Sequence, residues 1–575
     1  MVGLLFENGP LHIRADYSMA SNNVSWDRLA DYVWIDQPVG TGFSTGDLNT
    51  FVPNEDQMAI DFFGFLSNLV EVFPSLKTRP LHITGESYAG TYIPYITKAY
   101  FGMANPPVKL AKIAIGDGTM GSSFVFEELP ALSVIETYPQ LIGYDPEVYE
   151  YFKEQHHLCG YDLNLTYPQN GHFPTLKAPL SDIFAQSTIF TKQALFAEAM
   201  TRYATLSTES PSDLQKRSED WLKEKRDLTG RANGTIDPLF QCSVYEEMIV
   251  YALNYSFPWN QNRPMSLSGF DIYNVPDALF PQAPMDASIW LNDNATRAAI
   301  HAPDKTWSQS VPYQFAGPNG RDPSVEPMAF FTDLATNASK AGVSIVLYSG
   351  NDDSLVAHRG TEVVIQNTTF GGIQGFTRKP STPWFDDQGQ FAGVVHQERN
   401  LTYVLFEGAG HLVPQQQPGR AFVFLREFVL GNNETGLVTN NSGTVSVVGG
   451  DSSTLYVNGL LPGQSSIFVG AGSTQSAVTY PSQTIEAWAK FSATAIAALG
   501  STGGSDGGSA APTKNGAIRL GDRGRGVLGA VCAMLVVVFS ILSSSGEDGQ
   551  LPFNTVPSFE KLSPWSKCWD SAAVG

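Results

Sequence analysis

The fold is decided by the stretch Leu81-His82-Ile83-Thr84-Gly85-Glu86-Ser87-Tyr88-Ala89-Gly90. Its last six residues read G-x-S-x-A-G and resemble the nucleophile-elbow pattern G-x-S-x-G, with Ala89 in place of the second glycine and Gly90 directly after it. That pattern marks a sharp turn that places a serine between the end of a strand and the start of a helix. The residues in front, 81–84, are expected to form a short buried strand, and residues 91–100 a helix that contains Pro94. Glycines belong in so tight a turn because Cβ atoms would clash there. The motif alone is common by chance, but this context favours a nucleophile elbow.

The composition is that of a large globular protein. The chain has 575 residues, of which 42% are hydrophobic and 16% charged, so it can bury a large core and has room for more than one domain. Its formal net charge of −21 argues against nucleic acid as a partner, because such a surface repels phosphates.

The chain divides by pattern into seven parts. Residues 1–120 alternate apolar strand-like runs with helical ones, which predicts the first part of a mostly parallel sheet covered by helices. Residues 121–285 hold long polar helical stretches and are expected to form a helical insertion over that core, and residues 286–432 return to the α/β pattern. We expect a small β-rich appendage at residues 433–499 and a Gly/Ser-rich linker at residues 500–526. An apolar run follows at residues 527–542, and residues 543–575 form a tail of unknown role.

Residues 527–542 form an apolar run that is the candidate for membrane attachment. The run is short for a full span, which takes about 20 residues. Small residues, a spacer and an apolar tail are typical of a glycosylphosphatidylinositol (GPI) attachment signal, although such a signal should end the chain. A true span with a short tail is the alternative, and a buried core helix is less favoured so far beyond a linker.

Glycosylation sequons and cysteines indicate the secretory pathway. Four cysteines are present, at positions 159, 242, 532 and 568, and none has the close spacing of a metal site. In an oxidising compartment, Cys159 and Cys242 are a plausible disulfide pair, and two free thiols are the alternative. The N-x-S/T sequons are at Asn23, Asn164, Asn233, Asn254, Asn294, Asn337, Asn367, Asn400, Asn433 and Asn440. We expect a secreted or surface-anchored protein, with a vacuolar location as the alternative. The chain opens without a signal peptide, so we expect its N-terminus to be incomplete.

A serine in such an elbow needs a base and an orienting carboxylate, which follow it in the order Ser, Asp/Glu, His. The strand-like run 343–348 is followed by Ser349-Gly350-Asn351-Asp352-Asp353, and the run 401–406 by Glu407-Gly408-Ala409-Gly410-His411. Three histidines follow these two aspartates in the chain. His358 comes before any further strand, and His396 precedes the last strand. His411 lies just beyond the last strand and is therefore the candidate base. Either aspartate could orient it.

Several segments together resemble the serine carboxypeptidase family, in its secreted fungal form. They occur in family order and cover the chain to about residue 430: Phe6-Glu7-Asn8-Gly9-Pro10, Trp34-Ile35-Asp36-Gln37-Pro38-Val39-Gly40-Thr41-Gly42-Phe43-Ser44, Gly85 to Gly90, Tyr348 to Asp353, and Gly408 to Pro414. The resemblance implies an α/β-hydrolase fold, with Ser87 as nucleophile, His411 as base and Asp353 as orienting acid. Asp117 departs from the asparagine usual in the family.

The resemblance also implies how a substrate is held. Glu7 and Glu86 are expected to lie together and bind the substrate's terminal carboxylate, because one of two adjacent carboxyls keeps its proton and can donate it in a hydrogen bond. This implies activity at acidic pH. Phe6 and Leu412 are candidates for the pocket of the released residue, with ordinary core packing as the alternative.

The oxyanion hole is expected to be incomplete in this chain. The backbone N–H of Tyr88 is the expected first donor. The second donor in the family is a glycine in a segment upstream of Gly3, which this sequence lacks. Loss of such a donor costs about 100- to 1,000-fold in turnover, so weak activity is expected of the chain as written.

Our hypothesis is a serine-type carboxypeptidase that removes C-terminal residues from peptides and proteins through an acyl-enzyme, without a metal or organic cofactor. One alternative is an acyltransferase or esterase that uses the same three residues. The other is a catalytically impaired glycoprotein, because of the absent glycine segment.

Overall fold

The structure is a computed structural model. It describes residues 1–14, 17–46, 51–171, 173, 176, 232–237, 240–261, 270–278, 286–309, 311, 313–317, 320–431, 438–440, 443–445, 461–469, 476–501 and 534–539. The helical stretches expected within residues 177–231, the tail 543–575, Cys532 and Cys568 lie outside these residues.

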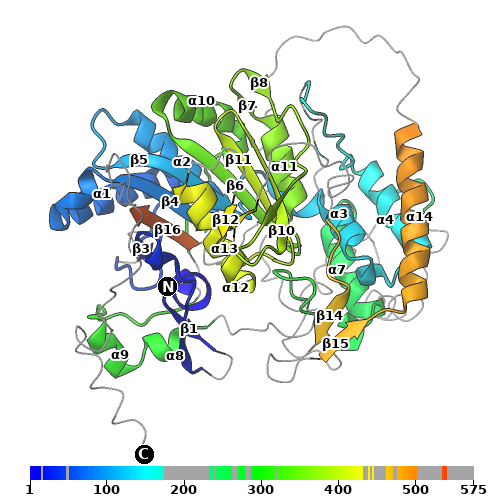
Figure 1. Ribbon diagram of the computed structural model, residues 1–575, viewed down its shortest axis with the longest axis horizontal. Helices are drawn as coiled ribbons and strands as arrows, with labels where there is room; N and C mark the ends of the chain where they lie inside the picture. Colours follow the sequence, from blue (N-terminus) through cyan, green and yellow to red (C-terminus); the bar gives the residue numbers. More distant parts are fainter. Residues whose placement is uncertain are drawn as a thin grey trace, which may run out of the picture. The chain divides into compact units, whose positions relative to one another are not determined.

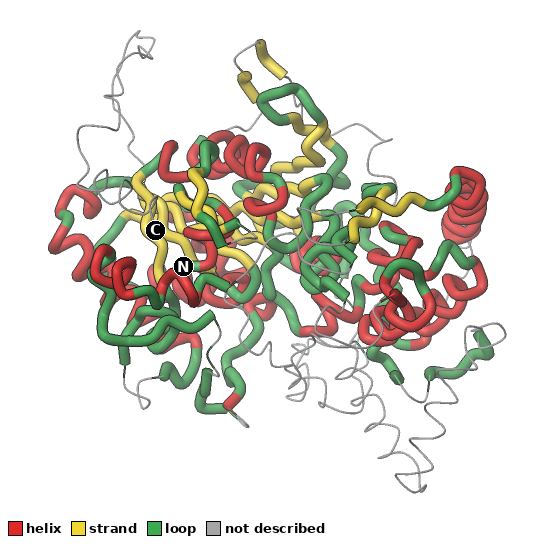
Figure 2. Tube along the Cα trace, turned by 90° about the horizontal axis from the view of Figure 1, so that it is seen from below, coloured by secondary structure: helices red, strands yellow, loops and turns green. Residues whose placement is uncertain are grey.

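A central sheet organises the described part of the chain. Eight described strands follow the order β3-β16-β4-β5-β6-β11-β10-β9. In chain order they are β3 (Asp31–Ile35), β4 (Pro80–Glu86), β5 (Lys109–Gly116), β6 (Ser344–Gly350), β9 (Thr382–Phe385), β10 (Phe391–Glu398), β11 (Leu401–Phe406) and β16 (Met534–Phe539). The strands β4, β5, β6 and β11 are parallel neighbours, whereas β10 and β9 continue the sheet antiparallel. Figure 1 and Figure 2 show helices on both sides of these strands.

The parallel strands are rich in apolar residues and mostly buried, as expected of a sheet that is covered on both faces. Alternate residues of β5 divide between two apolar clusters: Ile113 and Ile115 join one, and Ala114 the other. Strand β6 divides in the same way, with Leu347 in the first cluster and Val346 in the second. The sheet therefore separates two halves of the core, as the α/β pattern of the sequence predicts.

Helices cover the two faces. The first cluster contains apolar residues of α1 (Glu55–Val72), α2 (Ala89–Gly102), α10 (Phe331–Ala341) and α11 (His358–Asn367), and the second contains residues of α12 (Val413–Gln416) and α13 (Pro418–Phe424). Helix α1 begins where the Asn54 side chain accepts a hydrogen bond from the Gln57 N–H, at 2.9 Å. The short elements near the core are β1 (Leu11–Ile13), β2 (Met19–Ser21), β7 (Thr369–Phe370), β8 (Ile373–Gln374), α8 (Ser288–Leu291) and α9 (Asn294–Ala299).

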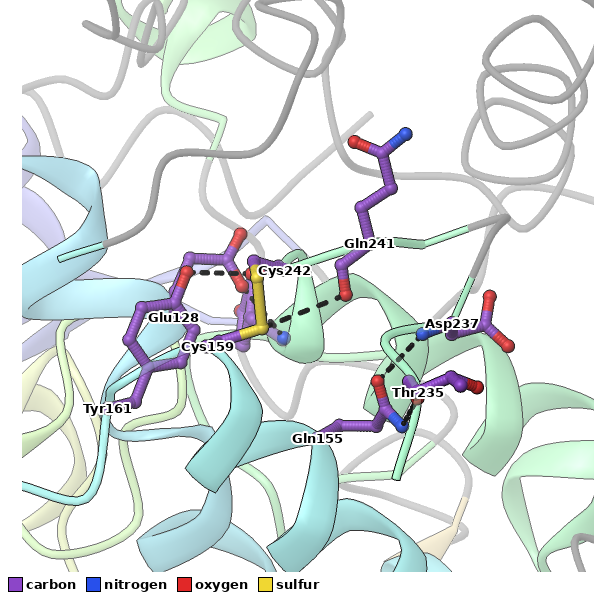
Figure 3. The surroundings of a disulfide bond; sticks show 9 residues. Glu128, Gln155, Cys159, Tyr161, Thr235, Asp237, Gln241 and Cys242 are labelled. Carbon is purple, nitrogen blue, oxygen red and sulfur yellow. Dashed lines mark hydrogen bonds between the residues drawn. A yellow bond between two sulfur atoms is a disulfide. The ribbon is translucent and has the colours of Figure 1, made fainter. Parts of the chain in front are cut away.

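The insertion contributes α3 (Ala131–Thr137), α4 (Pro146–Leu158) and α7 (Val244–Tyr255). The expected disulfide is present, since Cys159 after α4 is bonded to Cys242 before α7 (Figure 3). Both cysteines are buried, and the Tyr161 hydroxyl donates to the Cys242 carbonyl at 2.8 Å. The disulfide therefore links two helices whose connection in the chain includes the undescribed residues 177–231.

The C-terminal region contains more helix than the sequence analysis expected. It has the predicted short strands, β12 (Val438–Asn440) paired with β13 (Gly443–Val445) and β14 (Ser466–Val469) paired with β15 (Ser476–Thr479). It also has α14 (Ser482–Ser501), a helix in the range assigned to the β-rich appendage and the start of the linker. Trp488 and Phe491 pack edge-on against Tyr149 of α4, with ring centroids 5.5 and 5.7 Å away. This packing on the insertion stabilises the helix.

The apolar run 527–542 also differs from the expectation. Its residues 534–539 form β16, which lies antiparallel between β3 and β4 (Figure 1). Within the described ranges, no helix has the length and apolar character that a membrane crossing needs. The hydropathy of this run favours a membrane segment, but a run rich in valine also suits a strand that is paired on both edges.

Candidate active site

Ser87 stands at the turn between β4 and α2, as the elbow motif predicts. Its backbone has φ of +63°, a strained left-handed conformation for a residue with a side chain. Its N–H donates to the Gly116 carbonyl at 2.9 Å, and its carbonyl accepts from the N–H groups of Gly90 and Thr119 at 2.8 and 3.1 Å. A Cβ on Gly90 would lie 2.3 Å from the Thr119 nitrogen, so this position requires glycine.

Asp353 and His411 meet in the described structure. The Oδ2 atom of Asp353 lies 2.7 Å from Nδ1 of His411, and both side chains are buried. The Oδ1 atom of Asp353 accepts from the N–H groups of Leu355 and Val356 at 2.8 and 3.2 Å. The carboxylate is thus held in one orientation. Oγ of Ser87 and Nε2 of His411 are buried without a hydrogen-bond partner among the described residues, and such contacts often tighten only when substrate binds.

The other candidate histidines have other acidic partners. Nδ1 of His358 lies 3.2 Å from Glu362, and Nε2 of His396 lies 2.8 Å from Glu398. Asp352, the other candidate acid, accepts a hydrogen bond from Gln464 at 2.8 Å. The pairing therefore joins His411, the histidine that chain order favours, to Asp353, the aspartate that the resemblance implies.

The loops that carry Asp353 and His411 approach so closely that no Cβ fits between them. A Cβ on Gly350 would lie 2.1 Å from the Gly410 carbonyl oxygen. The His411 N–H donates to the Tyr273 carbonyl at 2.7 Å, and the two rings are 5.0 Å apart between centroids. Tyr273 thus positions the histidine. Tyr273 lies in an irregular stretch whose local pattern carries no signal for such a role, so the sequence does not predict it.

Glu7 and Glu86 are buried acids near this pair. Burial raises the pKa of Glu7 to about 8. Burial also raises the pKa of Glu86 well above its usual value, and the charges of Glu7, Asp117 and Asp353 raise it further. Both carboxylate oxygens of Glu7 and one of Glu86 have no hydrogen-bond partner among the described residues. Two neighbouring acids with free oxygens are suited to share protons and to donate to an anionic ligand.

Asp117 adds a third buried acid to the cluster. It follows β5 with φ of +41°, and its N–H donates to the Tyr348 carbonyl at 2.9 Å. Its Oδ1 accepts from the Gly350 N–H at 2.9 Å, at the start of the loop that carries Asp353. Burial raises the pKa of Asp117 well above its usual value, and the charge of Asp353 raises it further. Burial and the charge of Asp353 therefore both favour the neutral form of Asp117.

The remaining predicted site residues are placed as follows. Tyr88 precedes α2, where the first N–H groups of a helix have no intrahelical acceptor, and its hydroxyl donates to Asp322 at 2.8 Å. Phe6 is buried in an apolar cluster with residues 2, 5 and 13, which agrees with the core-packing alternative. Leu412 is buried directly before α12. The pocket role of both residues stays a prediction.

The sequons differ in accessibility. The asparagines at positions 23, 164, 233, 294 and 337 are exposed, and Asn367 is half-buried. Nδ2 of Asn254 donates to the Val250 carbonyl, and Nδ2 of Asn400 donates to the Val343 carbonyl, so in both residues the nitrogen that would carry a glycan already forms a hydrogen bond within the fold. Asn433 lies outside the described residues, and of Asn440 only the backbone is described.

The mixed sheet, the strained serine and the Asp–His pair define an α/β-hydrolase with a serine-type site. A family model described as "Serine carboxypeptidase" matches residues 1–431. The chain therefore belongs to the serine carboxypeptidase family, which confirms the resemblance seen in the motifs, and it is a serine-type carboxypeptidase by class.

Curated relatives agree with this family. A "Probable serine carboxypeptidase" of Arthroderma benhamiae is 28% identical over 458 residues, which cover 75% of this chain and 74% of the relative. "Serine-type carboxypeptidase F" of Aspergillus niger is 26% identical over 454 residues, or 73% of each chain. The crystal structure of Kex1(delta)p, a prohormone-processing carboxypeptidase from Saccharomyces cerevisiae, has a TM-score of 0.47 at 21% identity, over 78% of this chain and 83% of that one. The fungal relatives and the disulfide fit a protein of the secretory pathway.

Proposed function

We propose that Ser87, His411 and Asp353 act together to cleave the C-terminal peptide bond of peptides and proteins. Ser87 Oγ attacks the scissile carbonyl while Nε2 of His411 takes its proton and passes it to the leaving amine. Water then hydrolyses the acyl-enzyme by the reverse sequence of proton transfers. Asp353 keeps the proton of His411 on Nδ1, so that Nε2 is free to act as base. The 2.7 Å contact between these two side chains supports this assignment.

Specificity for a free C-terminus comes from Glu7 and Glu86. The observation that carries this proposal is the buried pair of glutamates, with three oxygens free of partners among the described residues. A protonated carboxyl donates a hydrogen bond to the terminal carboxylate of the substrate. An amide or ester at that position lacks the negative charge that makes such a hydrogen bond strong.

The same pair makes the proposed activity favour acidic conditions. Both acids have raised pKa values, that of Glu7 being about 8. At low pH the pair carries enough protons to donate to the substrate. As the pH rises through these values, the glutamates become charged and repel the terminal carboxylate.

We propose that the enzyme works outside the cytosol, as a secreted, surface-anchored or vacuolar protein. Attachment through residues 527–542, either as a span or as a GPI signal, would require residues 534–539 to leave the sheet. The six-residue strand β16 cannot pair with β3 and β4 and also cross a bilayer.

An N-blocked dipeptide and its C-terminal amide, assayed from pH 4 to pH 8, test this function. We expect preference for the free acid at low pH, and loss of all turnover in Ser87→Ala. Equal or better cleavage of the amide and of an ester would instead favour an esterase or acyltransferase. A wild-type protein that is folded but inactive on all three substrates would favour the impaired glycoprotein.

A further inference from the structure

Beyond the family domain, residues 461–469 lie against the loop that carries the proposed catalytic acid. The family match ends at residue 431, and this segment follows it in the chain. Nε2 of Gln464 donates to Oδ2 of Asp352 at 2.8 Å, and Asp352 is the residue next to Asp353. The carbonyls of Leu461 and Pro462 lie 3.5 and 3.4 Å from Nδ2 of Asn351. The segment therefore contacts the two residues before Asp353.

Asp352 needs these donors because its side chain is buried. It is 1% exposed, and burial raises its pKa to about 6. Hydrogen bonds from Tyr138 and Gln464 oppose that rise, because they stabilise the charged form. The Asp352 N–H also donates to the Ala409 carbonyl at 2.7 Å, close to His411. A displaced Asp352 side chain would thus disturb both loops that form the Asp353–His411 contact.

Gln464 is itself held in place by the insertion. Its N–H donates to the Tyr138 hydroxyl at 3.1 Å, and its carbonyl accepts from Nε2 of Gln140 at 3.2 Å. The preceding Gly463 lies so close to the insertion that a Cβ would stand 2.5 Å from the Thr137 carbonyl oxygen. Gln464 therefore connects the insertion to the loop of the core.

The same segment also pairs with the stretch that holds His411. The Phe468 N–H donates to the Pro276 carbonyl at 2.6 Å, and the Phe468 carbonyl accepts from the Ala278 N–H at 2.9 Å. This stretch supplies the Tyr273 carbonyl to His411, and the Val275 N–H to the Asp352 carbonyl at 3.0 Å. One short segment thus braces both partners of the Asp353–His411 pair.

We propose that Gln464 is a positioning residue for Asp353: its side-chain amide fixes Asp352, and the segment Leu461–Val469 thereby keeps the acid in register with His411. This inference rests on the proposed roles of Ser87, Asp353 and His411. It assigns to a segment beyond the family domain a part in the reaction that the core carries out.

Gln464→Glu tests the proposal because the new side chain has the same shape and can donate only while it is protonated. We expect the ratio of the variant's kcat to that of wild type to be near one at pH 4 and about tenfold lower at pH 7. A tenfold loss corresponds to one hydrogen bond to a charged group. KM should stay within twofold of the wild-type value. A role in folding alone would change the amount of folded enzyme with pH and would leave kcat per folded enzyme unchanged. Gln483→Ala, at an exposed glutamine of α14, is the matched control and should behave as wild type.

A double-mutant cycle tests the route through Asp352. Gln464→Ala should lower kcat about tenfold alone, but should have little further effect in an Asp352→Ala background. Equal losses in both backgrounds, or a pH-independent kcat in Gln464→Glu relative to wild type, would overturn the proposal.

The labelling rate of Ser87 by a fluorophosphonate gives a readout that does not depend on the substrate. A wild-type protein that is labelled but does not cleave the dipeptide would refute the carboxypeptidase assignment, and the labelling rates of the variants would still decide the role of Gln464. A wild-type protein that is not labelled would refute the assigned triad, and this inference with it.

Discussion

Oδ2 of Asp353 lies 2.7 Å from Nδ1 of His411, while Oδ1 of the same carboxylate accepts two backbone N–H groups. The acid therefore cannot rotate without losing hydrogen bonds on both sides. This fixed carboxylate sets the tautomer of the histidine, because an acceptor at Nδ1 requires the proton to be there.

Asp353→Asn should abolish most activity without unfolding the protein. The amide keeps the shape of the side chain, but its NH₂ group facing Nδ1 would favour the proton on Nε2, where it blocks the base. We expect kcat to fall by about 10³–10⁴-fold with little change in KM, measured on the N-blocked dipeptide. Asp352→Asn, which changes the neighbouring acid in the same way, should lose much less. A similar loss in both variants would contradict the assignment of Asp353.

Replacing the two buried glutamates should remove the alkaline fall in activity on free-acid substrates. Glu7→Gln/Glu86→Gln keeps donors at every pH, so kcat/KM for the free acid should decline less between pH 5 and pH 8 than in wild type. The wild-type decline should be about tenfold for each unit of pH above the controlling pKa. The C-terminal amide is the control substrate, because its cleavage involves no terminal carboxylate. An unchanged profile in the double variant would show that another group controls the alkaline limb.

Asp117→Asn should stabilise the protein at neutral pH. The folded-state pKa of Asp117 is raised above the ordinary value of 3.8, so between those two values the folded state holds one proton more than the unfolded state. The free energy of unfolding therefore falls with rising pH by up to about 1.4 kcal/mol per unit across that window. The asparagine variant lacks this loss of stability with rising pH, because its side chain does not ionise.

Urea denaturation at pH 4 and pH 7 measures the effect of Asp117→Asn. The urea concentration at the midpoint should be higher for the variant than for wild type at pH 7, but nearly equal at pH 4. The reason is that pH 4 lies close to the ordinary value of 3.8, where the loss of stability with rising pH only begins. If variant and wild type have equal midpoints at both pH values, folding does not raise the pKa of Asp117. The asparagine should preserve the bond from the Gly350 N–H, because its side-chain oxygen can accept it.

The sequence predicted the core of this site because its residues lie in local patterns. The elbow at Ser87 needs a strand, a glycine and a helix in immediate succession, and His411 follows the last core strand directly. In contrast, the contacts of Gln464 and Tyr273 join segments that are remote in the chain, and neither residue has a distinctive neighbourhood. The helix α14 was missed because its stability comes from Tyr149, in a part of the chain more than 300 residues earlier.

Removing the disulfide should destabilise the insertion. Cys159 and Cys242 are 83 residues apart, and closing so long a loop restricts the unfolded chain strongly. Cys159→Ala/Cys242→Ala should lose about 2–5 kcal/mol of unfolding free energy, measured by urea denaturation. Addition of a reductant should destabilise wild type but not the double variant. If the reductant destabilises wild type and the double variant equally, its effect does not come from the Cys159–Cys242 disulfide.

Deleting residues 527–575 should destabilise the protein by leaving two strand edges unpaired. Strand β16 pairs with β3 from Leu535 to Phe539 and with β4 from Met534 to Phe539. Each backbone hydrogen bond contributes about 1 kcal/mol net, so the loss should amount to several kcal/mol in urea denaturation. The matched control deletes only residues 543–575 and keeps β16, so its midpoint should lie well above that of the longer deletion. If both deletions leave the midpoint unchanged, and only the longer one releases the protein from membranes, the apolar run serves as an anchor and does not belong to the sheet.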